Sequence, residues 1–328
     1  MCAERRVEPQ PKVKYPDSWV YVSTPQQART YLTALIDSPI DAVRVQSSVG
    51  RDRLQDIFDR SYQMPQSHTS DAMEILRRSL PQEQRELIEK FPPYFIIAPR
   101  DFFLALGKVE PCSKSGVHAF YSNTDGTFPG VLFDRRSNVV FIREDEHTET
   151  RKEHPTSFTK ELVHESLHYI SATSRKSEIT HFLDEGMTEF LTVKSTGTAL
   201  TLENSFGVYP MGVMTISVFE QLVGYDEIQK AYLSGDTSKI RAKVDSIMGV
   251  GTFDILTADI DGNEKARLRE WPKRNDLLVD LMISADIDPG KVAKELRELG
   301  KAYLPVIKPG GKKEVANCSE MVWKRRTG

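Results

Sequence analysis

The sequence predicts an α+β protein in which a mixed N-terminal part is followed by a mainly helical C-terminal part. The longest apolar runs are only as long as strands, and both Tyr94–Ala98 and Val139–Ile142 lie in the first half of the chain. From Ser157 to about Tyr303, apolar residues mostly recur at helical spacing. The chain has 328 residues, of which 39% are hydrophobic, so it can bury a large core in one or two domains.

Composition and charge exclude several classes of protein. Lys and Arg number 44 against 47 Asp and Glu, and the net charge of −3 argues against nucleic acid as the main partner. No stretch approaches the roughly 18 apolar residues that a transmembrane helix needs. The three cysteines are widely spaced and odd in number, so they predict neither a disulfide framework nor a cysteine metal site. The sequence leaves the oligomeric state open.

The two ends of the chain are expected to lack regular structure. Residues 1–24 predict an extended, proline-rich leader, and residues 306–328 predict a loose basic tail. Because the leader has no apolar segment of the kind that signal peptides carry, we expect a cytoplasmic protein. Two alternatives stay open: export by a leaderless route, and lipidation at Cys2 after removal of a longer leader.

Residues 25–155 are expected to form the N-terminal α/β part. Thr24 is a suitable N-cap and Pro25 suits the first helical position, so a helix is predicted from there to Ile36. The next predicted elements, in order, are helices over Gly50–Arg60, Ser70–Arg78 and Pro81–Lys90 and a buried strand over Tyr94–Ala98.

Two apolar runs on either side of a polar turn at residues 134–137 predict a β-hairpin. Its arms are residues 130–133 and 138–142, directly before the next predicted helix. Such a hairpin can form the edge of a cleft and bind an extended peptide by strand addition, or it can be a plain core hairpin. The charged stretch 143–154, which ends at Pro155, predicts a loop.

Residues 156–305 are expected to form the mainly helical part, and its first helix carries an H-E-x-x-H motif. His164, Glu165 and His168 make up this motif, and residues four apart lie on one face of a helix. Both imidazoles can therefore bind the same ion. Apolar residues at positions 163, 167 and 170 give the helix a separate buried side, and Ser157 is a suitable N-cap.

A second helix downstream favours a metal site over a histidine pair that is merely solvated or buried. Within residues 180–192, His181, Glu185 and Glu189 recur every four residues, opposite an apolar stripe. A zinc ion with two histidine ligands needs a third protein ligand and an open position for water, and Glu185 can supply that ligand. The adjacent Gly186 permits a close approach of two helices. His181 stays open as a competing ligand or as a cleft or surface residue.

The H-E-x-x-H motif at residues 164–168 and the Asp-Glu-Gly sequence at residues 184–186 together resemble the gluzincin zinc metallopeptidases. That group includes the thermolysin-like enzymes and the zinc aminopeptidases. The resemblance covers about residues 156–195, and Asp184 departs from it because Asn is common at this position. The chain shows no G-x-M-E-N exopeptidase motif, which favours an endopeptidase.

The resemblance implies a zincin-like fold with one Zn²⁺ per chain, bound by His164, His168 and Glu185. Glu189 matches the carboxylate that bonds to a metal-binding histidine in that group. Bound zinc lowers the pKa of its water to roughly 7, and Glu165 can accept the proton and pass it to the leaving amine. The sequence thus predicts a zinc-dependent hydrolase, an endopeptidase acting on protein or peptide substrates. The alternative is a zinc-binding sensor or interaction protein that keeps the fold without turnover, and the presence of Glu165 favours the enzyme.

Stabilising the oxyanion of a peptidase usually needs a hydrogen-bond donor besides the metal. Tyr209 is the preferred candidate, because its Gly- and Pro-flanked sequence predicts a loop just after the helix of Glu185. Tyr225 and Tyr232 are alternatives. Each of these tyrosines could instead be a packing residue.

Overall fold

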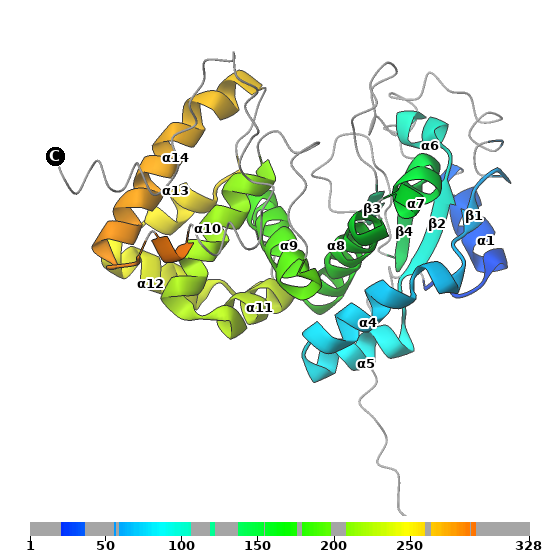
Figure 1. The fold of residues 1–328 in the computed structure, drawn as a ribbon, viewed down its shortest axis with the longest axis horizontal. Coiled ribbons are helices and arrows are strands. Elements are labelled where there is room, and N and C mark those ends of the chain that lie inside the picture. The colour runs from blue at the N-terminus through cyan, green and yellow to red at the C-terminus, as the bar shows by residue number, and fades with distance from the viewer. Residues whose placement is uncertain are drawn as a thin grey trace, which may run out of the picture.

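The computed structural model describes residues 21–36, 56, 59–105, 119–121, 137–153, 155–175, 179–197, 208–259, 264–288 and 290–292. The described chain is mostly helical with one small sheet, which confirms the α+β class (Figure 1). Most of the predicted leader, most of the helix predicted over Gly50–Arg60, the hairpin arm 130–133 and the basic tail lie outside these residues.

The sheet has four strands in the order β1-β2-β4-β3. Their bounds are β1 Tyr62–Gln63, β2 Tyr94–Ala98, β3 Ala119–Tyr121 and β4 Val139–Arg143. The two central strands, β2 and β4, are parallel, and every residue of both is buried. This burial agrees with their unbroken apolar sequences, which are typical of strands covered on both faces. Both strands are therefore confirmed.

The neighbours of β4 differ from the predicted hairpin. β4 pairs with β2 along one edge and antiparallel with β3 along the other, where Ala119 lies opposite Ile142. The strand 138–142 is consequently an inner strand, and both of its edges already have hydrogen-bonded partners. It cannot form the cleft edge by itself, and in the described sheet that outer position belongs to β3.

Short helices surround the sheet in the N-terminal part. Their bounds are α1 Pro25–Ile36, α4 Ser70–Ser79, α5 Gln82–Lys90 and α6 Arg100–Ala105, and a single 3-10 turn, η1, spans Gln66–His68. At the start of α1, Thr24 Oγ1 accepts from the backbone N of Gln27 at 3.2 Å, and Gln27 Oε1 accepts from the backbone N of Thr24 at 3.1 Å. This reciprocal capping explains why α1 begins where the sequence predicts.

The charged stretch after β4 is helical, so the prediction of a loop over 143–154 is wrong. A π-helical turn, η2, spans Glu146–Thr150, and the short helix α7 spans Arg151–Glu153. His147 is buried in this stretch, and its ring packs edge-on against the ring of Phe158. Helical backbone satisfies its own polar groups, which suits a segment that packs against the next helix.

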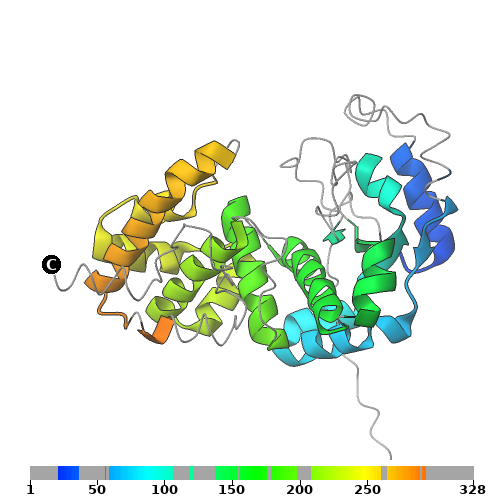
Figure 2. The same ribbon diagram turned by 45° about the horizontal axis from the view of Figure 1, so that its top comes forward.

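The C-terminal part is entirely helical among its described residues. It contains α8 Pro155–Ser174, α9 His181–Thr196, α10 Val208–Val223, α11 Tyr225–Ser234, α12 Ser238–Met248, α13 Thr252–Thr257 and α14 Glu264–Ser284. The predicted cap at Ser157 is wrong, because α8 already starts at Pro155, whose missing N–H and fixed φ suit a first helical position. α8 lies between the sheet and the other C-terminal helices (Figures 1 and 2).

A continuous apolar core joins the two parts, from Met64 to Val292. Helices α9 and α10 pack closely at two glycines, where a Cβ built on Gly186 of α9 would lie 3.0 Å from the Cα of Gly212 in α10. Glycine at position 186 therefore does permit two helices to approach, and the partner is α10. No helix in the described part of the chain is long and apolar enough to cross a bilayer.

Candidate metal centre

The candidate site is formed by two neighbouring helices, α8 and α9, which lie side by side in both views (Figures 1 and 2). The start of α9 is fixed by Thr180, whose Oγ1 accepts from the backbone N of Leu183 at 3.3 Å and donates to the carbonyl of Thr257 at 2.6 Å. Asp259 also accepts from the backbone N of Phe182 at 2.7 Å. These contacts bind the first turn of α9 to the chain after α13, and they set which face of α9 meets α8.

Three ligand atoms converge where the helices meet. His164 Nε2 lies 3.2 Å from His168 Nε2 and 3.6 Å from Glu185 Oε2, and the distance from His168 Nε2 to Glu185 Oε2 is 3.5 Å. A circle through the corners of a triangle with these sides has a radius of about 2.0 Å, which is close to zinc–ligand distances of about 2.0–2.2 Å. An ion slightly above the plane of the three atoms can therefore contact all of them at normal bond lengths.

Glu185 Oε2 is a buried oxygen that lacks a hydrogen-bond donor in suitable geometry among the described residues. A buried carboxylate oxygen without a partner is costly, and a bound cation would remove this cost. The donor set of two imidazoles and one carboxylate is that of catalytic zinc sites, which keep a fourth position open. His164, His168 and Glu185 therefore fit a zinc ion both in geometry and in chemistry.

Without an ion, opposite charges hold the cluster together. Burial alone would lower the pKa of His164, but the nearby carboxylates of Glu185 and Glu189, which favour the protonated imidazole, raise that pKa to about 10. Burial also opposes the charged form of His168, yet the charges of Glu185 and Asp184 raise its pKa. The pKa of Glu185 is lowered despite its burial, because both imidazoles stabilise the carboxylate. A metal ion would take the place of the protons on the two imidazoles.

His164 is oriented by Glu189, one turn beyond Glu185 on α9. Glu189 Oε2 lies 2.9 Å from His164 Nδ1, so this nitrogen donates to the carboxylate and Nε2 faces the cluster. Lys160 Nζ donates to the other oxygen, Glu189 Oε1, at 2.6 Å. All three groups are buried, and the structure brings Glu189 to the position predicted from the sequence.

His168 has a different set of neighbours. Its Nδ1 lies 3.5 Å from Asp184 Oδ2 and 3.4 Å from Thr188 Oγ1. Asp184 Oδ1 is in close contact with Arg175 Nη2, and Thr188 Oγ1 is 2.7 Å from the hydroxyl of Tyr232. Asp184, where the gluzincin pattern commonly has Asn, thus lies between a histidine of the cluster and a guanidinium.

Glu165 follows His164 on α8 and is 7% exposed. Burial is the main cause that raises the pKa of its carboxyl to about 7, and Glu161 and Glu185 add to the shift while the imidazoles oppose it. A carboxyl that titrates near neutral pH can both accept and return a proton. A cation bound at the cluster would lower this pKa and favour the carboxylate form.

His181 lies beside the cluster without joining it. Its Nδ1 is 3.7 Å from Glu185 Oε1, the oxygen that faces away from the two histidines, and its side chain is 36% exposed. Glu185 therefore offers one oxygen to the cluster and the other to His181. Of the three residues at four-residue spacing, only Glu185 belongs to the ligand triangle, whereas His181 and Glu189 lie outside it.

The three candidate tyrosines have different surroundings. Tyr209 lies in the first turn of α10, so the predicted loop is wrong there; Pro210 is tolerated because N–H groups in a first turn have no helical partner. The side chain of Tyr209 is outside the described set, and its role stays a prediction. Tyr232 is fully buried, and the ring of Tyr225 lies near the ring of Phe190. Both side chains therefore have the surroundings of packing residues.

Sequence reasoning missed Lys160 and Arg175. Lys160 is four residues before His164, and Arg175 is seven residues after His168, so helical spacing puts both cations on the histidine side of α8. That spacing was the available signal. The contact between Arg175 and Asp184 could not be found in the same way, because it joins two helices.

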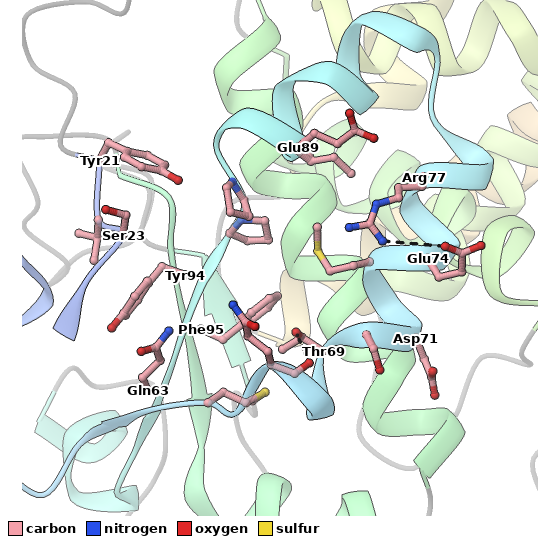
Figure 3. A pocket seen from close by; sticks show the side chains of 18 residues that line it. Tyr21, Ser23, Gln63, Thr69, Asp71, Glu74, Arg77, Glu89, Tyr94 and Phe95 are labelled. Carbon is pink, nitrogen blue, oxygen red and sulfur yellow. Dashed lines mark hydrogen bonds and ion pairs between the residues drawn. The ribbon is translucent and has the colours of Figure 1, made fainter.

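A cavity of about 690 Å³ lies in the N-terminal part of the molecule (Figure 3). Its walls are formed by residues between Tyr21 and Phe95, and Arg77 and Glu74 form an ion pair at 3.9 Å on one side. The buried hydroxyl of Tyr94 has no hydrogen-bond partner among the described residues. None of the three cluster residues lines this cavity, so it is separate from the candidate metal centre.

Comparisons with protein-family models, with curated proteins and with solved structures found no match to this chain.

Proposed function

We propose that this chain is a zinc-dependent endopeptidase with a zincin-like arrangement of its catalytic helices. The observation that carries the proposal is the triangle of His164 Nε2, His168 Nε2 and Glu185 Oε2, whose dimensions suit one zinc ion. When bound there, Zn²⁺ supplies a Lewis acid for the scissile carbonyl and lowers the pKa of its water to about 7.

Glu165 is the proposed general base and acid. It is buried next to His164 on the same helix, and a carboxyl in this position can take a proton from water and give it to the leaving amine. The bond between His164 Nδ1 and Glu189 keeps the ligand nitrogen Nε2 turned toward the ion, so the orientation of His164 depends on Glu189 and not on Glu165.

The substrate class is inferred from the sheet. β3 is one of the two outer strands of the described sheet and lies against α8, the helix of the H-E-x-x-H motif (Figure 1). An extended peptide can add to such an edge through main-chain hydrogen bonds, which make few demands on sequence. This supports a protein or peptide substrate that is cleaved within the chain.

The test is cleavage of a proteome-derived peptide library by zinc-loaded wild-type protein and by Glu165→Gln, with mass spectrometry of the products. Wild type should produce internal cleavages, and Glu165→Gln should keep its zinc but lose roughly 10²–10⁴-fold in rate, because it lacks the base. Glu83→Gln, which changes an exposed carboxylate in the first turn of α5, is the control, and it should cleave at a rate close to that of wild type.

Two outcomes would contradict the proposal. If Glu165→Gln cleaves as fast as wild type, the proton-transfer role of Glu165 is wrong. If wild type binds zinc but cleaves no peptide, the chain is better described as a zinc-binding sensor or interaction protein that has the site without turnover.

A further inference from the structure

We infer that Arg175, acting through Asp184, is a positioning residue for His168 and sets the zinc affinity of the cluster. The inference rests on the proposed zinc site and extends it to residues outside the ligand set. It also explains why this chain carries Asp at position 184, where the pattern that it resembles commonly has Asn.

Arg175 is held on three sides. It is the residue directly after α8, and its side chain is only 8% exposed. Its Nε donates to the backbone carbonyl of Tyr232 at 3.0 Å, and its guanidinium carbon lies 4.9 Å from the centre of the Tyr232 ring. Its Nη2 contacts Asp184 Oδ1. A planar guanidinium fixed at several points has little freedom, so it holds the Asp184 carboxylate in one orientation.

Asp184 transmits this orientation to the metal cluster. Its second oxygen, Oδ2, lies 3.5 Å from His168 Nδ1, on the side of the ring that faces away from the cluster. Thr188 Oγ1 lies 3.4 Å from the same nitrogen and donates to the backbone carbonyl of Asp184 at 2.7 Å. With acceptors on the Nδ1 side, His168 keeps its proton there and presents the lone pair of Nε2 to the ion.

Arg175 also balances charge. Glu189, on the His164 side, is paired with Lys160, and Asp184, on the His168 side, is paired with Arg175. Each of these two carboxylates thus has its own cation, so the two pairs add no net charge to that of the imidazoles, Glu185 and Glu165. Without Arg175, Asp184 would be an uncompensated carboxylate and would lose the contact that fixes its direction.

The test is the zinc dissociation constant of Arg175→Gln, Arg175→Lys and wild type, measured with a competing chelator. Arg175→Gln should bind zinc roughly 10–100-fold more weakly, as is typical when a group behind a ligand histidine is lost. The zinc dissociation constant of Arg175→Lys should lie between those of wild type and Arg175→Gln, because lysine restores the charge without the planar two-point contact. The cobalt-substituted protein should show a changed ligand-field spectrum in Arg175→Gln.

Lys194→Gln is the matched control. Lys194 is a partly buried cation on α9 that pairs with Glu220 at 3.1 Å and lies nine residues, or more than two helical turns, beyond Glu185. The control should lose an ion pair of similar kind while keeping the zinc affinity and the cobalt spectrum of wild type. Melting temperatures of the zinc-free proteins measure the purely structural cost of each substitution.

Asp184→Asn tests the contact of residue 184 with His168 separately from the contacts that hold Arg175, because it leaves the contacts between Arg175 and Tyr232 in place. It should weaken zinc binding by roughly 10-fold, the lower end of the loss expected behind a ligand histidine, because Asn keeps an acceptor but not the charge. It replaces Arg175→Gln as the test if that variant does not fold. A folded Arg175→Gln or Asp184→Asn protein with wild-type zinc affinity would overturn the inference. A wild-type chain that binds no zinc would instead refute the proposed function itself.

Discussion

In the part of the chain that the structure describes, two pairs of histidines lie within hydrogen-bonding distance, and the charges around the two pairs differ. His164 and His168 approach to 3.2 Å between carboxylates of α9. His68 Nδ1 and His147 Nε2 approach to 2.9 Å, but their neighbours include the rings of Tyr62 and Phe158. Among the described residues, only the first pair forms a group with a carboxylate that could hold a metal ion.

The pKa values of the two pairs move in opposite directions. The pKa of His147 is lowered to about 4, first by burial and then by the nearby positive charges of His68, Arg151 and Lys152. The pKa of His164 is raised to about 10, because the hydrogen bonds of two carboxylates outweigh burial. Close imidazoles therefore do not define a metal site by themselves. The carboxylates that α9 brings to α8 make the difference.

The largest effect that this comparison predicts is for Glu185→Ala. Removing the carboxylate leaves the two histidines without a third ligand, so tight zinc binding should be lost, by more than about 100-fold in the dissociation constant. Competition with a chromogenic chelator measures this constant. Retention of wild-type affinity would show that a different group completes the metal site.

A smaller effect is expected for Glu189→Ala. Glu189 bonds to His164 Nδ1 and Lys160 rather than to the ion, so its loss should weaken zinc binding by roughly 10–100-fold and leave one site per chain. The same chelator assay compares both variants. A greater loss for Glu189→Ala than for Glu185→Ala would mean that the two carboxylates have exchanged roles.

The smallest effect concerns the second histidine pair and the pH dependence of stability. A histidine whose pKa is lower in the folded than in the unfolded state stabilises the fold above pH 6.5, and this stability is lost as the pH falls toward about 4. Zinc-free wild type should therefore lose more free energy of unfolding between pH 7 and pH 4.5 than His147→Phe.

The expected difference between these two proteins is about 2 kcal/mol, since the unfolded chain takes up a proton near pH 6.5 and the folded chain only near pH 4, and one pKa unit corresponds to about 1.4 kcal/mol. Urea unfolding at both pH values measures it. The histidines that do not contact His147 are present in both proteins, so their titration cancels, whereas His68 lies 2.9 Å from His147 and the two titrate as a pair. Equal losses in both proteins would show that folding does not lower the pKa of His147.

How much the sequence predicts depends on whether a contact lies within one helix or between elements. His164, His168, Glu185 and Glu189 follow from four-residue spacing, because this spacing decides which side chains share a helix face. The contact of Asp184 with Arg175 depends on how α8 and α9 are packed, which no spacing within one helix can give.

The sheet shows the same limit. The strands β2 and β4 are evident from their apolar runs, but strand order depends on long-range pairing, and β3 takes the place expected for the residues just before β4. The stretch 144–153 looks like a loop because it is charged. It is helical because His147 is buried against Phe158, a tertiary contact that outweighs local composition.

The zinc content of three dialysed proteins tests the central claim most directly: wild type, the double variant His164→Ala/His168→Ala, and the double variant His68→Ala/His147→Ala. We predict one zinc ion per chain in wild type and in the His68/His147 variant, and almost none in the His164/His168 variant. A metal-free wild type, or zinc that is lost with His68 and His147 but kept without His164 and His168, would contradict the account.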